Sequence, residues 1–225
     1  QNDPNNIYIL NNLGLINTRL NNNKIAREYL DKALSINKDY IDALVNLANL
    51  DLAEMNMNDA KSNYDKALKL SKSKQSDEII YTALGHYHQQ VGDFELALKN
   101  LYKVNEINPH NTTADKSISL ITKYKDINDD HIKSMLNKLN LNLSKEQKQS
   151  LYFSLGKAYE DIKLYKESFD FLNSANKIAN DKYKYNLNDD KRLFQELQEL
   201  FKSSKSQLKT DLKTKIIFIV GMPRS

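Results

Sequence analysis

The chain has 225 residues, of which 40% are hydrophobic and 28% are charged, with a net charge of +4 at pH 7. So small and evenly spread a charge argues against a nucleic-acid partner. The lack of cysteine excludes disulfides and thiolate zinc sites, and no apolar run approaches the ~20 residues that span a bilayer.

A repeating pattern of small and bulky residues begins near Asn5 and continues to about Lys182. Its anchors are four small residues separated by 34, 37 and 71 positions: Gly14, Ala48, Gly85 and Gly156. Because the last interval equals the first two combined, one further, degenerate unit is expected before the last anchor. A bulky apolar residue follows each anchor after sixteen positions: Leu30, Tyr64, Leu101 and Leu172.

This spacing resembles that of tetratricopeptide repeats, in which each unit is a pair of antiparallel helices. A glycine inside a helix costs about 1 kcal/mol relative to alanine. Glycine at three of the four anchors therefore indicates that a neighbouring helix packs against the bare backbone. We expect a mostly α, right-handed superhelix of antiparallel helix pairs over residues 1–182. Its units are predicted at about 7–40, 41–74, 78–111, 112–148 (degenerate, two irregularly stacked helices) and 149–182.

Local signals mark the ends of some of these helices. Pro109 closes the third unit, because proline cannot continue a helix. Ser144 and Gln147 form a capping box that opens the last unit. Residues 183–214 are predicted to be a capping helix and a linker, with the helix capped by Asp189-Asp190. Its apolar stripe, which would shield the last repeat, consists of Leu193, Phe194, Leu197, Leu200 and Phe201.

The final stretch, residues 215–225, has a different character. The apolar run Ile216–Val220 predicts a strand buried on both faces, as in parallel α/β sheets. Gly221 allows the backbone to turn sharply where the strand ends. Arg224 and Ser225 then place a positive charge and a hydroxyl at the carboxyl end of the strand, where such sheets bind ligands.

The stretch Ile216–Ser225 resembles the opening strand and first half of the 5′-phosphosulfate loop of sulfotransferases, particularly tyrosylprotein sulfotransferases. With the repeats, the chain resembles bacterial tetratricopeptide-repeat sulfotransferases. The resemblance implies sulfuryl transfer from 3′-phosphoadenosine 5′-phosphosulfate to a hydroxyl acceptor, with protein tyrosine as one candidate. Arg224 would stabilise the leaving phosphate. The loop residues that would bind the donor are Gly221, Met222, Pro223, Arg224 and Ser225.

Two alternatives stay open. Gly221 and the four residues after it also fit the start of a Walker A loop, which would continue as Gly-Lys-Ser or Gly-Lys-Thr instead of Gly-Thr-Thr. The second alternative is a non-enzymatic tetratricopeptide scaffold for protein interactions, with no α/β domain after Ser225. The chain is expected to be a fragment that lacks the catalytic base, and therefore to be inactive alone. Cytoplasm is the default location, since no signal peptide is visible.

No metal site is predicted, because His86 and His88 diverge on one helix and the histidines are expected on the surface or in the groove. Asp129-Asp130 is interpreted as a helix cap. The inner face of the first helices of each unit is predicted to be either a groove for a protein or peptide or a scaffold face without particular affinity. Its residues are Asn11, Leu15, Val45, Asn49, Thr82, His86, Phe153 and Lys157.

Overall fold

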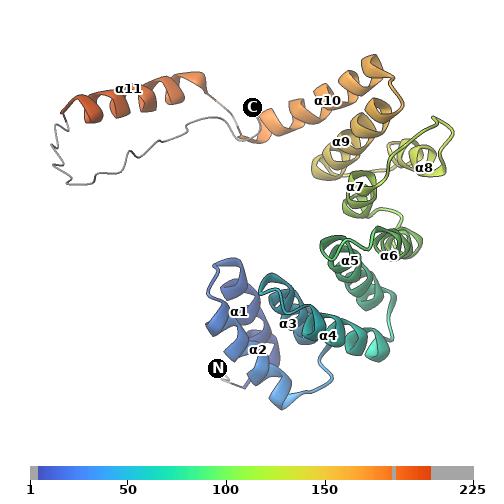
Figure 1. Ribbon diagram of the computed structural model, residues 1–225, viewed down its shortest axis with the longest axis vertical. Helices are drawn as coiled ribbons and strands as arrows, with labels where there is room; N and C mark the ends of the chain where they lie inside the picture. Colours follow the sequence, from blue (N-terminus) through green and yellow to red (C-terminus); the bar gives the residue numbers. More distant parts are fainter. Residues whose placement is uncertain (1–4, 184–185, 204–225) are drawn as a thin grey trace, which may run out of the picture. The chain divides into compact units, whose positions relative to one another are not determined.

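The computed structural model describes residues 5–183 and 186–203, and these residues contain eleven α-helices and no strand (Figure 1). The chain divides into two units, Gln1–Lys182 and Tyr183–Ser225. The helices of the first unit are α1 (Ile7–Arg19), α2 (Asn23–Ile36), α3 (Ile41–Ala53), α4 (Met57–Leu70), α5 (Lys74–Gln90), α6 (Phe94–Ile107), α7 (Thr112–Ile121), α8 (Asp130–Lys138), α9 (Lys145–Asp161) and α10 (Tyr165–Tyr183, which ends at the boundary). The second unit contains α11 (Leu187–Ser203).

The first six helices form three antiparallel hairpins, α1–α2, α3–α4 and α5–α6 (Figure 1). Each hairpin turn contains one left-handed residue: Asn21, Met55 or Gly92, with φ of 59°, 65° and 82°. Lys163, with φ 65°, has the same place between α9 and α10. In each of these four turns, the residue after the left-handed one donates its N–H to the carbonyl five positions back, which closes the first helix of the hairpin in a Schellman motif. One turn geometry therefore recurs through the regular hairpins.

The repeat anchors lie where the two helices of a hairpin approach each other. A Cβ atom built on Gly14, Gly85 or Gly156 would lie 2.6, 2.7 and 2.6 Å from the nearest side-chain carbon of the partner helix. Those carbons belong to the bulky residues of the pattern, Leu30, Leu101 and Leu172. The prediction that a helix packs against bare backbone at these glycines is confirmed.

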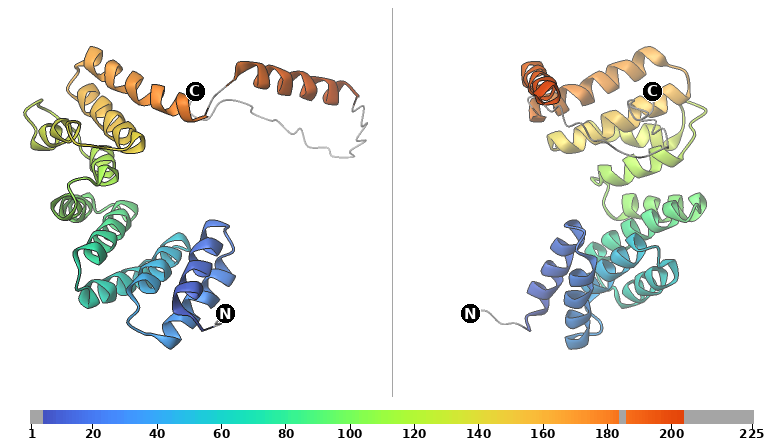
Figure 2. Two further views of the ribbon diagram at one scale, coloured as in Figure 1. Left: turned by 180° about the vertical axis from the view of Figure 1, so that it is seen from behind. Right: turned by 60° about the vertical axis from the view of Figure 1, so that its left-hand side comes forward.

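The fourth hairpin is irregular. Two helices are present, as predicted, but α7 packs mainly against α6 and α9, and α8 contacts α9 (Figure 2). The connection at residues 122–129 carries Tyr124, which is 1% exposed. The Tyr124 N–H donates to Asp161 Oδ2 at 3.1 Å, and Lys157 Nζ lies 5.1 Å from the centre of its ring. The connection therefore takes part in the core beside α9.

Two predicted helix starts are confirmed. The Ser144 side chain accepts from the Gln147 N–H while the Gln147 side chain accepts from the Ser144 N–H, which completes the capping box of α9. The Asp129 side chain caps α8 by accepting the N–H of His131 at 2.9 Å. Asp129 is thus a structural carboxylate at a helix N-terminus.

The predicted cap of the last helix is wrong. The helix α11 begins at Leu187, where Asn186 Oδ1 accepts the Asn188 N–H at 3.0 Å. Asp189 and Asp190 therefore lie in the first turn, where the positive end of the helix dipole still stabilises their negative charges. The apolar side chains Leu193, Phe194, Leu197 and Leu200 are exposed, and their role as a cover for the last repeat stays a prediction.

Candidate functional site

The residues predicted to bind the sulfuryl donor, 221–225, lie outside the described residues, as does the predicted strand at 216–220. The α/β domain therefore stays a prediction. Within residues 5–183 and 186–203, no group of three or more His, Asp or Glu side chains is arranged to hold a metal ion. No helix in those ranges is long and apolar enough to cross a membrane.

A hollow of about 320 Å³ lies on the inner face formed by α3, α5 and the start of α7, and we call it the α3–α5 hollow. The structure brings four of the predicted groove residues together there: Val45, Asn49, Thr82 and His86. The remaining lining residues are Glu78, Ile79, Ala83 and Asn111. Val45, Ile79 and Ala83 form the apolar floor of the hollow, and the other five lining residues are polar.

The other predicted groove residues have local partners or lie elsewhere. Asn11 is buried and accepts a hydrogen bond from Asn46 at 2.8 Å. Lys157 donates to the Thr122 carbonyl and pairs with Asp161. Both side chains hold neighbouring elements together, so they are not offered to a ligand. Leu15 and Phe153, on α1 and α9, are half-buried and do not line this hollow.

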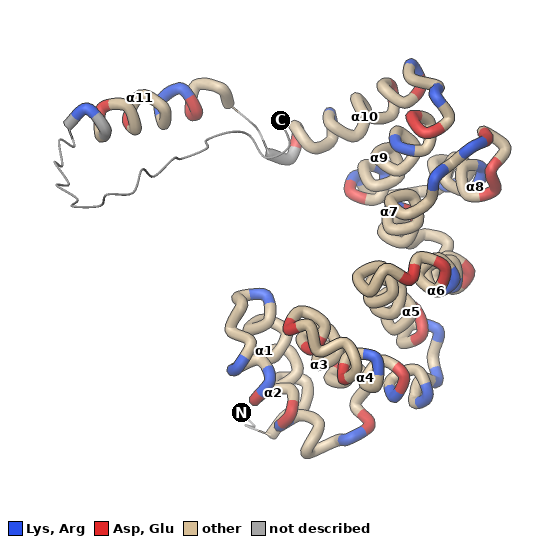
Figure 3. Tube along the Cα trace, in the orientation of Figure 1, with Lys and Arg blue, Asp and Glu red and all other residues tan. Residues whose placement is uncertain are grey.

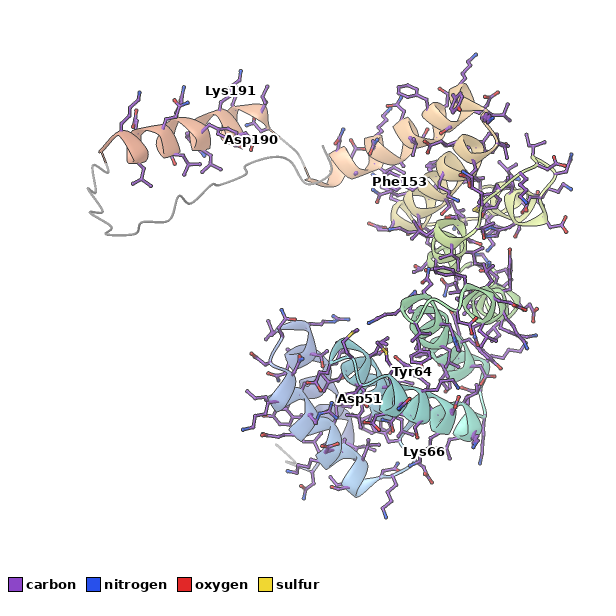
Figure 4. All side chains as sticks on the ribbon, in the orientation of Figure 1. Asp51, Tyr64, Lys66, Phe153, Asp190 and Lys191 are labelled. Carbon is purple, nitrogen blue, oxygen red and sulfur yellow. The ribbon has the colours of Figure 1, made fainter. Side chains whose placement is uncertain are left out.

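Asn49 has a fixed orientation at the edge of the hollow. Its side chain is exposed, and its Oδ1 accepts a hydrogen bond of 2.6 Å from the Tyr64 hydroxyl (Tyr64 is labelled in Figure 4). Tyr64 is fully buried on α4, and burial raises the pKa of its phenol, so the hydroxyl remains a donor at neutral pH. Because Oδ1 accepts this hydrogen bond, the two N–H groups of the Asn49 amide are left to donate to other groups.

Glu78 is positioned by the loop that leads from α6 to α7. Its Oε1 accepts from the side-chain amides of Asn108 and Asn111, each at 2.8 Å. The Oδ1 atoms of the same two asparagines accept the N–H groups of His110 and Ala114, both at 3.0 Å, which fixes each amide. Glu78 is the only acidic or basic residue, apart from His86, among the eight that line the hollow.

His86 closes the side of the hollow nearest to α7. Its Nε2 lies 3.2 Å from Ser117 Oγ. Loss of solvation lowers the pKa of His86 below its ordinary value, so the ring is neutral at physiological pH. The hollow therefore has the single negative charge of Glu78. Elsewhere, positive and negative residues are interspersed along the described helices (Figure 3).

A buried polar cluster joins α6, α7, α8 and the 122–129 connection. Asp115, which is 0% exposed, accepts from Lys138 Nζ at 2.8 Å and from Asn105 Nδ2 at 2.8 Å. His131 Nε2 lies 3.1 Å from Asp115 Oδ1, and the Tyr124 hydroxyl lies 2.6 Å from His131 Nδ1. A Tyr124 hydroxyl that donates to Nδ1 leaves Nε2–H to donate to Asp115, so one tautomer satisfies both contacts.

The protonation states in this cluster indicate a structural role. Burial alone would raise the pKa of Asp115, but the hydrogen bond from His131 and the charge of Lys138 outweigh it and hold that pKa below its usual range. Burial raises the pKa of Tyr124, whose phenol therefore stays protonated. A tyrosine that is 1% exposed and protonated does not act as a nucleophile on a substrate.

A second hollow, of about 590 Å³, lies beside this cluster. It is lined by Tyr102, Asn105, Glu106, Asp129, Asp130, His131 and Ser134. Of its carboxylates, Asp129 caps α8 and Asp130 is fully exposed. Its buried lining residue His131 already has a partner in Asp115. The α3–α5 hollow, with fixed and incompletely used polar atoms, is therefore the better candidate site.

Sequence reasoning placed the histidines on the surface or in the groove, and for two of them this is wrong. His131 and His88 are 3% and 7% exposed, so both belong to the core. Glu78 and its two asparagine partners were not predicted from the sequence. The only available signal was the stretch from Asn108 to Asn111, in which two residues that favour caps and turns flank Pro109.

Comparison with known proteins supports the repeat assignment. The family described as Tetratricopeptide repeat matches residues 7–40 and 79–111. No curated protein matches the chain.

Solved structures with a similar fold share little sequence with it. The pilF protein of Pseudomonas aeruginosa is 18% identical with a TM-score of 0.59, over 76% of this chain and 75% of that one. A MamA structure is 18% identical with a TM-score of 0.55, over 77% and 98%. YrrB is 18% identical with a TM-score of 0.53, over 78% and 88%. The part of the chain that the structure describes thus has an all-helical repeat fold, and it contains tetratricopeptide repeats at residues 7–40 and 79–111.

Proposed function

We propose that this chain is a protein-interaction module that binds a peptide segment of a partner at the α3–α5 hollow. The proposal depends on one observation. The hollow combines an apolar floor with two polar side chains, Asn49 and Glu78, that internal hydrogen bonds orient but do not saturate. Oriented polar groups around an apolar floor are typical of ligand sites.

Each of these side chains keeps bonding capacity for a ligand. The Tyr64 hydroxyl occupies only the oxygen of the Asn49 amide, and Asn108 and Asn111 occupy only one oxygen of Glu78. An amide donor beside the hollow suits a peptide carbonyl, which any extended peptide presents along its main chain. YrrB, whose fold is similar, is described as a tetratricopeptide-repeat protein with an unusual peptide-binding site, and this supports a peptide as the ligand class.

Selection from a phage-displayed library of random short peptides tests the proposal. Peptides enriched on the 225-residue chain are synthesised, and their affinity is measured by fluorescence anisotropy. The Tyr64→Phe/Asn49→Ala variant removes the amide without leaving a buried hydroxyl unpaired, and Tyr64→Phe alone is its matched control. The loss of one hydrogen bond should weaken binding about three- to tenfold relative to the control. Failure to enrich any peptide, or equal affinity in both variants, contradicts the proposal.

A second proposal concerns residues 215–225, whose sequence favours a phosphosulfate loop. We propose that in a longer gene product they open a sulfotransferase domain in which Arg224 contacts the 5′-phosphate of 3′-phosphoadenosine 5′-phosphosulfate. Its support is the resemblance of Ile216–Ser225 to the opening strand and loop of sulfotransferases, together with the repeats upstream. Continuation of the gene as Gly-Thr-Thr, with donor binding that Arg224→Ala weakens, is the expected result. Continuation as Gly-Lys-Ser or Gly-Lys-Thr, or a longer product that does not bind the donor, contradicts it.

A further inference from the structure

We infer that the α3–α5 hollow selects a basic side chain, a lysine or an arginine, from the peptide that it binds. The inference rests on the proposed peptide-binding function and adds the chemistry of the partner. It starts from Glu78, whose Oε1 accepts two amide hydrogen bonds while Oε2 has no partner among the described residues.

The surroundings of Glu78 favour a cation as that partner. Asn108 and Asn111 orient the carboxylate without neutralising it, so its negative charge remains available. His86, which lines the hollow from the same helix, is neutral at physiological pH and does not repel a cation. An ammonium or guanidinium group at Oε2 would form a charge-assisted hydrogen bond, which is about twice as strong as a neutral one.

The apolar floor suits the rest of a long basic side chain. Val45 and Ala83 are 4% and 7% exposed at the base of the hollow, and Ile79 is 45% exposed beside Glu78. Lysine and arginine bury their aliphatic stems along such surface while their charged ends remain polar. A volume of about 320 Å³ is near the lower end of ligand pockets, which are about 300–1,000 Å³. It suits one side chain and adjacent main chain rather than a folded domain.

An isosteric variant separates the charge of Glu78 from its structural role. Glu78→Gln keeps one carbonyl oxygen for Asn108 and Asn111, removes the negative charge and replaces Oε2 by an amide NH₂ group. Glu95→Gln, at an exposed position on the first turn of α6, removes the same charge away from the hollow and is the matched control. The melting temperature of each variant checks that the fold is intact. Substitution of norleucine for lysine, or citrulline for arginine, in the synthetic peptide removes the opposite charge without altering the protein.

The experiment uses the peptides selected on the full chain, measured by fluorescence anisotropy. We expect a lysine or arginine at one fixed position of these peptides. Glu78→Gln, and separately the neutral peptide, should each weaken binding about tenfold or more, and the two changes together should cost little more than one. Glu95→Gln should have no such effect.

Each outcome decides between the two claims. If selected peptides depend on Asn49 but show no basic position and bind Glu78→Gln as tightly as the wild type, the inference is overturned and peptide binding stands. If no peptide is enriched on the wild-type chain, the proposed function itself is contradicted. If the neutral peptide binds the wild type more weakly than the basic peptide does, but the two peptides bind Glu78→Gln about equally, the inference is supported.

Discussion

The contact between Gly85 and Leu101 makes a sharp prediction for Gly85→Ala. Alanine is favoured over glycine inside a helix by about 1 kcal/mol, so propensity alone predicts a more stable protein. A Cβ at position 85, however, would lie 2.7 Å from Cδ2 and 2.8 Å from Cγ of Leu101, which is fully buried. Carbon atoms in contact are normally about 3.5–4.0 Å apart, so Leu101 or the two helices must move by about 1 Å.

The effect of Gly85→Ala on the free energy of unfolding should change sign between the wild-type chain and a Leu101→Ala background. Overpacking of this kind costs about 1–3 kcal/mol. Subtracting the propensity gain, we expect Gly85→Ala to destabilise the wild-type chain by about 1 kcal/mol. In a Leu101→Ala background the overlap is removed and only the propensity gain remains. The same substitution should then stabilise by about 1 kcal/mol, a coupling of about 2 kcal/mol between the two positions.

Urea unfolding followed by circular dichroism at the helix band measures these free energies for the wild type, the two single variants and the double variant. Ala48, which is the same anchor in the second hairpin, provides a reverse control, because Ala48→Gly should cost at least about 1 kcal/mol. Stabilisation of the wild type by Gly85→Ala, to the same degree as in the Leu101→Ala background, would refute the packing argument.

Three further predictions follow from the described contacts. Asp115→Asn leaves Lys138 buried without its counter-ion and should lower the free energy of unfolding by about 3 kcal/mol at pH 7. Because the pKa of Asp115 is lower in the folded state, the stability that its charge contributes is complete above the unfolded value of 3.8 and is lost as the pH falls from there through the folded pKa. A difference in unfolding free energy between Asp115→Asn and the wild type that stays constant down to strong acid would contradict this. Tyr124→Phe removes the hydroxyl partner of the buried His131 and should cost about 1–3 kcal/mol in urea unfolding, and no loss would mean that the hydrogen bond is not made. Lys163→Gly relieves a left-handed residue and should raise stability by about 0.5–1 kcal/mol, seen as a higher melting temperature; a lower one would argue against the turn geometry.

The regular part of the fold was predictable because its information is local and repeated. An anchor such as Gly14 and the leucine sixteen positions later recur at fixed spacing, and that spacing identifies the two helices that touch. The capping box of Ser144 and Gln147 is equally local, and both its hydrogen bonds are present. These features require no knowledge of which hairpin packs on which.

The site and the fourth hairpin were less predictable because they depend on partners distant in sequence. Glu78 becomes a site residue only because a loop thirty or more positions later supplies Asn108 and Asn111. The buried His131 ring has the Tyr124 hydroxyl at Nδ1 and the Asp115 carboxylate at Nε2 as hydrogen-bond partners. Nothing in the local sequence pattern indicates these pairings. The groove residues on α3 and α5 were found because helical periodicity places them on one face.

The most direct test of peptide binding at the α3–α5 hollow is the side-chain amide signal of Asn49 in a ¹H–¹⁵N NMR spectrum during titration with a selected peptide. We predict that the Asn49 NH₂ signals shift with the same saturation curve as the anisotropy. The Asn105 NH₂ signals, whose group donates to the buried Asp115, should stay in place. Saturable binding that leaves the Asn49 signals unchanged would show that the peptide binds elsewhere and would contradict the account.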